Sequence, residues 1–379
     1  MYVRRQTRVG KVLLACLFIL FLIGIQISGC RDRKPIKIGF IAGTSGRVAD
    51  LGISGRDAIQ MVVEKYNQNG GINGSRIELV IRDDQQDPEL VRVLTQELID
   101  SGVVAIIGPM TSDMAMAVTP LLDKHQVVAI SPTATTRLLS GRDDFLFKVS
   151  STTLMHATKS AIYHINNTDV RRIAVIYDQT NSSFSEDWLK CFKDTFSANG
   201  GEIIATTGFD SSKGKSFTQI SSEMLRHEPD GILIIANSLE SAILCQQIRR
   251  VNPDISISLA DWGATERLLE LGGKTVEGVT VVQTFDRNHP GKRYQNFRRE
   301  YLKRYNREPG FPGVYTYDAT DLLLAALARQ EGNNLKETIL SIKNFPGLQS
   351  DFSFDTFGDV TRSHVSISVV QNGKFVVLE

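Results

Sequence analysis

The sequence predicts an α/β protein with two Rossmann-like, doubly wound lobes. Apolar, β-branched runs alternate with segments of helical periodicity along most of the 379 residues, which is the pattern of parallel sheets with right-handed crossovers. The same alternation restarts after Val149, and the chain is too long for one ordinary core. No low-complexity linker separates the halves, so we expect strands to cross between the lobes.

The first part of the chain contains the elements of one lobe. Asp87-Pro88 opens a helix with proline in its first turn, where the missing N–H is tolerated. Strands are expected at 36–41, 76–82, 103–107 and 127–130, with helices at 55–69, 87–98 and after 111, and residues 145–149 lead out of this lobe.

The second lobe repeats the order and then changes it near the C-terminus. Helices are expected at 154–165, 184–198, 217–226 and 239–251, and strands at 172–177, 202–207, 231–235 and 255–259. A strand at 279–284, helices at 294–305, 315–330 and 335–342, and β-rich segments at 352–354 and 365–377 complete the chain. The turn Gln371-Asn372-Gly373-Lys374 is typical of a hairpin. We assign 35–149 with 284–349 to the first lobe and 150–283 with 350–379 to the second.

The first 29 residues have the organisation of a signal peptide. A basic region containing Arg4, Arg5, Arg8 and Lys11 precedes an apolar run, which ends in Ile27-Ser28-Gly29-Cys30. This ending resembles the lipobox of bacterial lipoproteins, which implies cleavage before Cys30 and lipidation of its thiol. The alternative is an uncleaved anchor helix, although the apolar run is short for a membrane span. Both place the rest of the chain in the periplasm or at the cell surface, tethered to a bacterial membrane.

Charge and cysteine content exclude several classes of protein. Removal of residues 1–29 takes away four positive charges and no negative one, so the formal net charge falls from +1 to −3. No basic face is implied, and we expect no nucleic-acid partner. Cys191 and Cys245 remain after Cys16 and Cys30 are set aside, and both lie in apolar-periodic segments. We expect two buried free thiols instead of a disulfide.

The stretch from Ala105 to Thr136 contains the strongest indication of a binding site. Two buried strands in succession end in loops rich in hydroxyl groups, Thr111-Ser112-Asp113 and Ser131 to Thr136, and each loop leads towards a helix. In open α/β folds the ligand lies at this carboxyl edge of the sheet. Helix N-terminal amides and serine or threonine hydroxyls favour an anion, above all a carboxylate. The alternative is a pair of ordinary, well-capped turns.

A series of motifs resembles one known family. In order, they are IKIGFIAGTSG, SGRDAIQMVVEKYNQNGGINGSRIELVIRDDQQDP, VVAIIGPMTS, VVAISPTATT, IAVIYDQT, GKSFTQI, PDGILII, EGVTVV, YTYDATDLLLAAL and FSFDTFGDV. From Ile36 to Glu379 the chain is similar to type I periplasmic solute-binding proteins of the leucine/isoleucine/valine-binding family, which serve ATP-binding-cassette (ABC) importers. The resemblance implies two lobes that are joined by a hinge of three chain crossings and close over a ligand. It also implies an ABC permease as partner.

The resemblance also implies roles for individual residues. Ser112 and Thr135 are expected to hold a ligand carboxylate through their hydroxyls. Thr133 is expected to contribute backbone groups to that carboxylate or to a neighbouring ammonium, and Ala134 is a further candidate ligand-binding residue. The first crossing, Lys148 to Thr153, lacks the carboxylate that often meets an α-ammonium in this family. Asp261 could supply that charge, or Trp262 could stack on an apolar or aromatic ligand. The ligand is therefore an amino acid or an amine-free organic or aromatic acid.

The remaining candidate site residues have structural alternatives. Phe184 stands near the position where the family has a tyrosine, and Ser183 lies in a loop expected near the cleft. Tyr315 and Tyr317 begin a predicted helix and either line the cleft or pack between the lobes. Adjacent residues of a strand point to opposite faces, so Asp83-Asp84 are expected to cap the sheet edge and not to act as a catalytic pair.

Three functions follow from these observations. The first is a monomeric solute-binding lipoprotein of an importer, the second a ligand-sensing receptor module of the same fold, and the third an extracytoplasmic α/β enzyme. The sequence lacks the motifs G-x-S-x-G, G-x-G-x-x-G and H-E-x-x-H, and its six histidines show no zinc-type spacing. We therefore expect no enzyme activity, no metal and no cofactor.

Overall fold

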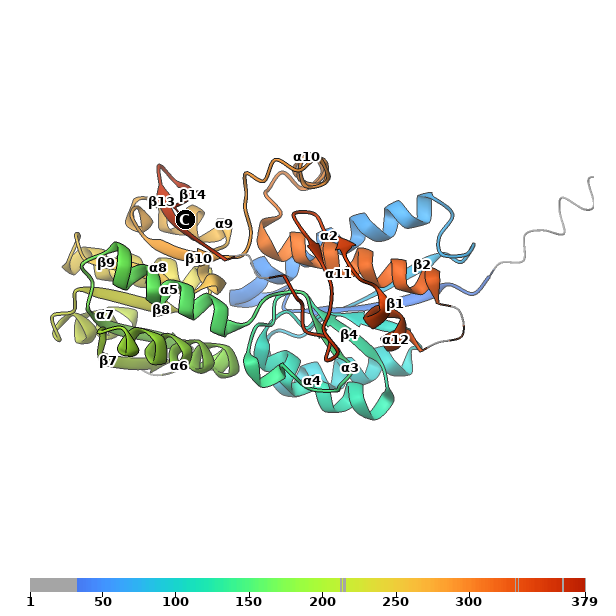
Figure 1. Cartoon of the computed structure of the whole chain (residues 1–379), viewed down its shortest axis with the longest axis horizontal. Helices are drawn as coiled ribbons and strands as arrows, with labels where there is room; N and C mark the ends of the chain where they lie inside the picture. The colour runs from blue at the N-terminus through green and yellow to red at the C-terminus, as the bar shows by residue number, and fades with distance from the viewer. Residues whose placement is uncertain are drawn as a thin grey trace, which may run out of the picture.

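The computed structural model describes residues 33–378 except 212, 214, 215, 331, 333, 363 and 364. Two sheets of mainly parallel strands, each flanked by helices, lie side by side (Figure 1). The predicted signal segment, with Cys30, lies outside the described residues. Within the described part of the chain, no helix is both long and apolar enough to cross a membrane. The arrangement of the elements confirms the predicted fold class.

The first sheet has five parallel strands in the order β2-β1-β3-β4-β5. Its strands are β1 (Ile36–Ala42), β2 (Ile77–Asp83), β3 (Ala105–Ile107), β4 (Val128–Ser131) and β5 (Leu146–Lys148), and its helices are α2 (Ala49–Gln68), α3 (Pro88–Asp100) and α4 (Ser112–His125). The central strands β3 and β4 are buried at every position, as expected for a sheet covered on both faces. The Asp87 side chain caps α3 by accepting the N–H groups of Glu89 and Leu90.

The second sheet has seven strands in the order β14-β13-β10-β9-β8-β6-β7. Its strands are β6 (Arg172–Asp178), β7 (Glu202–Phe209), β8 (Gly231–Ile235), β9 (Ser256–Leu259), β10 (Thr280–Gln283), β13 (Ser366–Gln371) and β14 (Lys374–Val377). Its helices are α5 (Thr153–Asn167), α6 (Ser182–Ala198), α7 (Phe217–Leu225), α8 (Ser238–Val251) and α9 (Glu266–Gly272). The predicted hairpin joins β13 to β14, and Asn372 and Gly373 both have positive φ, as a tight hairpin turn requires.

The chain passes between the two sheets three times, after β5, after β10 and after β12. Between the second and third passes it forms α10 (Lys292–Tyr305), α11 (Gly310–Arg329), α12 (Leu335–Ser341) and the small pair β11 (Phe345–Pro346) and β12 (Asp351–Phe352). Helix α11 packs against α2 beside the first sheet (Figure 1). A C-terminal segment therefore completes the layer of helices on the N-terminal sheet.

Two helices begin earlier than the sequence predicts. Helix α2 starts at Ala49 and not at Gly55, and α11 starts at Gly310 and not at Tyr315. Gly52 lies within α2 because the helix passes very close to the loop after β1: a Cβ at this position would stand 2.1 Å from the carbonyl oxygen of Gly43. Pro312 is tolerated in α11 because it falls in the first turn.

The two mature-chain cysteines are buried free thiols, as predicted. Cys191 belongs to an apolar layer of α6 that also contains Trp188, Phe192 and Phe196, whose rings stack in succession. His164 of α5 packs edge-on against Phe192, and its Nδ1 atom has no hydrogen-bond partner. Burial lowers the pKa of His164 to about 4.

This burial predicts a pH dependence of stability. Between pH 6.5 and 4, His164 binds a proton in the unfolded chain but stays unprotonated in the folded chain. The free energy of unfolding therefore falls as the pH falls. We expect His164→Leu to remove roughly 3 kcal/mol of this decline. The measurement is urea unfolding at pH 6.5 and pH 4, with exposed His227→Leu as the control. Equal declines in the two variants would contradict the prediction.

Candidate functional site

Two adjoining chambers lie where the carboxyl ends of the two sheets face each other. The first, which we call the apolar chamber, is lined by Leu51, Met110, Thr111, Ser112, Phe184 and Trp262, among others. The second, the polar chamber, is lined by Thr135, Ser150, His156, Gln283, Thr284 and Tyr315, among others. Thr133, Asp261 and Phe311 border both chambers. Each has a volume of about 20 Å³, which is enough for one water molecule, so a metabolite can enter only if the lobes separate.

The wall on the first sheet is built by the loops after β3 and β4. Ser131 connects them: its hydroxyl donates to the carbonyl of Pro109 at 2.6 Å and accepts the N–H of Ala134 at 3.2 Å. The Thr133 hydroxyl donates to the carbonyl of Met110. Ser112 is the first residue of α4, a 14-residue helix whose first amides have no acceptor within the helix. These contacts hold hydroxyls and a helix N-terminus together, a combination that favours an anion.

The wall on the second sheet centres on Asp261, which follows β9. Its Oδ1 accepts the indole N–H of Trp188 at 3.0 Å, and its Oδ2 lies 3.2 Å from Nδ1 of His156. The next residue, Trp262, meets Phe184 edge to face with ring centroids 5.5 Å apart. A carboxylate and an aromatic pair therefore face the hydroxyl-rich loops of the first sheet.

Several polar atoms around the chambers are buried and have no hydrogen-bond partner. They are Thr111 Oγ1, Thr135 Oγ1, His156 Nδ1 and Nε2, Trp262 Nε1 and Gln283 Nε2. A buried polar group without a partner costs about 1–3 kcal/mol, so such groups are rare in folded proteins unless a ligand or water satisfies them. Their presence at two adjoining chambers makes this gap the candidate binding site.

The structure brings together seven of the ten residues singled out from the sequence. Ser112, Thr133, Thr135, Phe184, Asp261, Trp262 and Tyr315 all line a chamber. Tyr315 donates its hydroxyl to the carbonyl of Thr284 at 2.7 Å, and the guanidinium of Arg362 lies over its ring.

The other three residues lie elsewhere. Ala134 is fully buried among apolar side chains, because its N–H is held by Ser131. Ser183 does not face a chamber, because the N-terminus of α6 is turned towards α4 and its N–H binds Asp113 at 2.8 Å.

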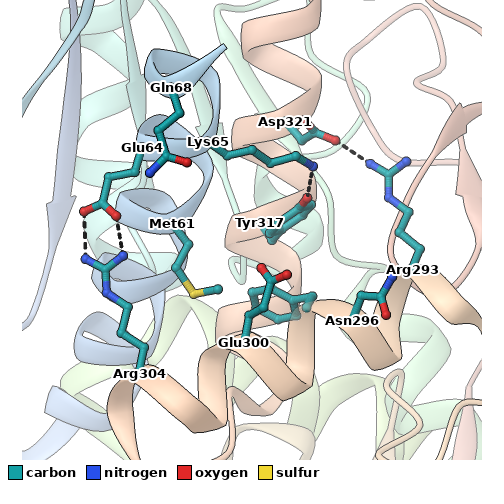
Figure 2. Close-up of a pocket in the computed structure, with 11 residues that line it drawn as sticks. Met61, Glu64, Lys65, Gln68, Arg293, Asn296, Glu300, Arg304, Tyr317 and Asp321 are labelled. Carbon is teal, nitrogen blue, oxygen red and sulfur yellow. Dashed lines mark hydrogen bonds and ion pairs between the residues drawn. The ribbon is translucent and has the colours of Figure 1, made fainter.

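Tyr317 lines neither chamber, so the structure does not bring it together with the other candidate residues. Residues two apart on a helix point about 200° apart, so Tyr315 and Tyr317 cannot face the same space. Tyr317 instead lines a 650 Å³ outer pocket between α2, α10 and α11 (Figure 2). There Glu64 pairs with Arg304, Asp321 pairs with Arg293, and Lys65 donates to the Tyr317 hydroxyl at 3.4 Å.

His156 and Gln283 line the polar chamber but were not identified from the sequence. His156 lies on the buried face of α5, where a single histidine looks like an ordinary core residue. Gln283 ends β10 at a chain crossing, and no motif marks it. Within the described residues, no group of three or more His, Cys, Asp or Glu side chains is arranged to hold a metal ion.

Charged contacts join the two sheets beside the chambers. Arg47, just before α2, lies 2.8 Å from Asp178 at the end of β6 and 3.1 Å from Glu240 in α8. The side chains of these two carboxylates are 0% and 3% exposed. We call these three residues the clasp. Burial and the neighbouring Asp178 raise the pKa of Glu240. The two carboxylates thus depend on Arg47 for neutralisation while the sheets are in contact.

A second set of contacts joins α4 to α6. The Asp113 carboxylate accepts the N–H groups of Ser182 and Ser183 at 2.9 and 2.8 Å, and Asn181 Oδ1 accepts the N–H of Asp113 at 3.0 Å. Asp113 belongs to the first turn of α4 and caps the N-terminus of α6. The helix that carries Ser112 is therefore positioned partly by the opposite lobe.

The chain belongs to the periplasmic binding protein family, whose model matches residues 35–373. It is 22% identical over 365 residues to the Leu/Ile/Val-binding protein BraC3 of Rhizobium johnstonii, with 92% of this chain and 95% of the relative covered. Family membership confirms the resemblance found in the sequence and the prediction of a binding protein that is not an enzyme.

Solved structures share the fold. A branched-chain amino acid substrate-binding protein, LivJ of Streptococcus pneumoniae, in complex with isoleucine, has a TM-score of 0.83 and 25% identity, covering 91% of this chain and 99% of that one. A solute-binding protein of Rhodopseudomonas palustris BisB5, in complex with 3,4-dihydroxybenzoic acid, has a TM-score of 0.81 and 23% identity, with 91% and 96% covered. The likeness in fold extends over both lobes.

The clasp predicts that Arg47→Ala favours separation of the lobes. The substitution leaves Asp178 and Glu240 buried without a cation, which costs about 3–5 kcal/mol and is relieved when the lobes part and water reaches them. We expect a larger radius of gyration in small-angle X-ray scattering. Arg92→Ala is the control, because the pair of Arg92 with Glu89 is exposed and contributes at most about 1 kcal/mol. Identical scattering from both variants would refute the role of the clasp.

Proposed function

We propose that this chain is an extracytoplasmic solute-binding lipoprotein of an ABC importer that captures a small carboxylate ligand between two lobes. The supporting observation is the set of buried, unpartnered polar atoms at the two chambers, Thr135 Oγ1 among them, opposite Asp261. The ligand carboxylate binds the hydroxyls of Ser112 and Thr135 and the amides at the start of α4. The related Leu/Ile/Val-binding proteins support a ligand of amino-acid size.

The proposed lobes are residues 35–149 with 284–349 and residues 150–283 with 350–379. The three chain passes between the sheets form the hinge. A ligand that contacts both lobes favours the closed arrangement by the free energy of those added contacts, and the permease recognises that arrangement. The lipobox-like sequence that ends at Cys30 supports a membrane tether through a lipidated thiol.

The ligand is either an amino acid or an amine-free acid, and Asp261 distinguishes the two. Oδ1 of Asp261 accepts the indole N–H of Trp188, and Oδ2 lies 3.2 Å from Nδ1 of His156. Both oxygens retain a lone pair that can accept an ammonium hydrogen. The solved relatives in complex with isoleucine and with 3,4-dihydroxybenzoic acid are consistent with both classes of ligand on this fold.

The carboxylate site predicts a loss of affinity in Ser112→Ala and Thr135→Val. Each substitution removes one charge-assisted hydrogen bond, so we expect the Kd of any bound acid to rise roughly tenfold to a hundredfold. A thermal-shift screen of amino acids and organic acids identifies the ligand, and titration calorimetry measures the Kd. Ser341→Ala on α12 is the matched control. An unchanged Kd in both site variants, or no ligand for the folded protein, would contradict the proposal.

Asp261→Asn tests whether an ammonium group is recognised. The matched ligands are leucine and 4-methylpentanoate, which share a carbon skeleton and differ in the amine. If an amino acid is the ligand, the substitution weakens leucine binding by roughly tenfold or more and leaves 4-methylpentanoate within a few-fold of its wild-type Kd. Equal effects on both compounds would exclude a role for Asp261 as the ammonium acceptor.

A further inference from the structure

Gln283 lines the polar chamber and has a hydrogen-bond donor without a partner. Its Oε1 accepts from Nη1 of Arg287 at 2.5 Å. Because a guanidinium only donates hydrogen bonds, the amide atom that faces Arg287 must be the oxygen, and this identifies the other amide atom as the nitrogen. Nε2 is buried without a partner, and the residue is 4% exposed.

The opposite side of the polar chamber presents acceptors. Asp261 borders the chamber and accepts hydrogen bonds only. His156 is 1% exposed, its Nδ1 lies 3.2 Å from Oδ2 of Asp261, and neither of its ring nitrogens has a hydrogen-bond partner. Both nitrogens can therefore form a hydrogen bond with a group that enters the chamber. Thr135 Oγ1, also unpartnered, can either donate or accept.

Few chemical groups satisfy a donor and an acceptor in the same small space. A methyl group would leave Gln283 Nε2 and His156 Nε2 unpaired. A second carboxylate would accept from Gln283 but would face the negative charge of Asp261. A neutral hydroxyl accepts from Gln283 and donates to His156 or Asp261 at once.

We propose that the ligand is a hydroxylated carboxylic acid, whose hydroxyl enters the polar chamber while its carboxylate binds the hydroxyl-rich loops of the first sheet. This inference rests on the proposed function and narrows its class of substrate. It separates the ligand from purely aliphatic amino acids such as leucine. A site with buried hydrogen-bonding groups rejects a ligand that lacks the matching group, because those groups then stay unpaired.

The test uses pairs of ligands that differ in a hydroxyl. They are valine with threonine, which are nearly equal in shape, and benzoate with 3- and 4-hydroxybenzoate. Calorimetry on the full mature chain is expected to show at least one hydroxylated compound binding about tenfold or more tightly than its parent. Equal affinities within every pair would overturn the inference, with water then filling the polar chamber.

Gln283→Glu is the decisive variant, because it keeps the shape of the side chain and the oxygen that accepts from Arg287. It replaces the donor with an acceptor, so the preference for the hydroxylated compound is expected to vanish. His156→Phe provides a second variant, with thermal unfolding as the check on folding. Gln247→Leu on α8, which lies outside both chambers, is the control and is expected to keep the preference.

The outcomes test solute binding and the preference for a hydroxylated ligand separately. If parent acids bind but the preference is absent in the wild-type protein, or persists in Gln283→Glu, the hydroxylated ligand is excluded while solute binding stands. If none of the five compounds binds and a wider screen of acids also fails, the proposed function falls and this inference falls with it. If Ser112→Ala raises the Kd of both members of a pair while the ratio of the two Kd values stays constant, the carboxylate and the hydroxyl of the ligand bind at separate positions.

Discussion

Buried polar atoms require hydrogen-bond partners, and this requirement determines which contacts form where the two sheets meet. Parallel strands direct their carboxyl ends, and the loops that follow, to one edge of a sheet. Here two such edges face each other, so hydroxyls, a helix N-terminus, a carboxylate, an amide and an imidazole are removed from water together. Water satisfies them when the lobes are apart. Contact between the lobes removes that water, and only some of the groups then find partners within the protein.

The contacts between the lobes divide into two kinds. In the clasp, Arg47 forms ion pairs with two carboxylates that would be buried without a cation if Arg47 were absent. The charged groups at this contact therefore find their partners within the protein. At the chambers, Thr135 and Gln283 keep buried atoms without partners, so closure there is incomplete within the protein alone. In the proposed function, a ligand that supplies these partners adds its binding free energy to that of the clasp, and this gives the differential affinity that a conformational switch requires.

Much of the fold and part of the site are evident from sequence patterns for local reasons. Alternating strands and helices, Asp87-Pro88 at the start of α3 and Asn372-Gly373 in a hairpin act through the backbone of a few neighbouring residues. The loops of Thr111 and Thr133 follow buried strands, so their place at the sheet edge follows from chain order. Sequence patterns did not indicate features that depend on long-range contacts. Helix α2 begins earlier than predicted because it packs closely on the loop after β1. The N–H of Ser183 donates to Asp113, which lies in the other lobe.

The sequence by itself determined the family, the class of fold and the hydroxyl-rich loops, because these depend on residue types at short spacing along the chain. Only the tertiary structure decided which side chains from distant segments share a chamber. His156 and Asp261 are more than a hundred residues apart in sequence, and Gln283 lies at a crossing between the lobes. Tyr315 and Tyr317, by contrast, are two residues apart and face different spaces. The rotation of a helix and the contact between the two lobes decide which chamber a side chain faces. Neither can be deduced from residue types at short spacing along the chain.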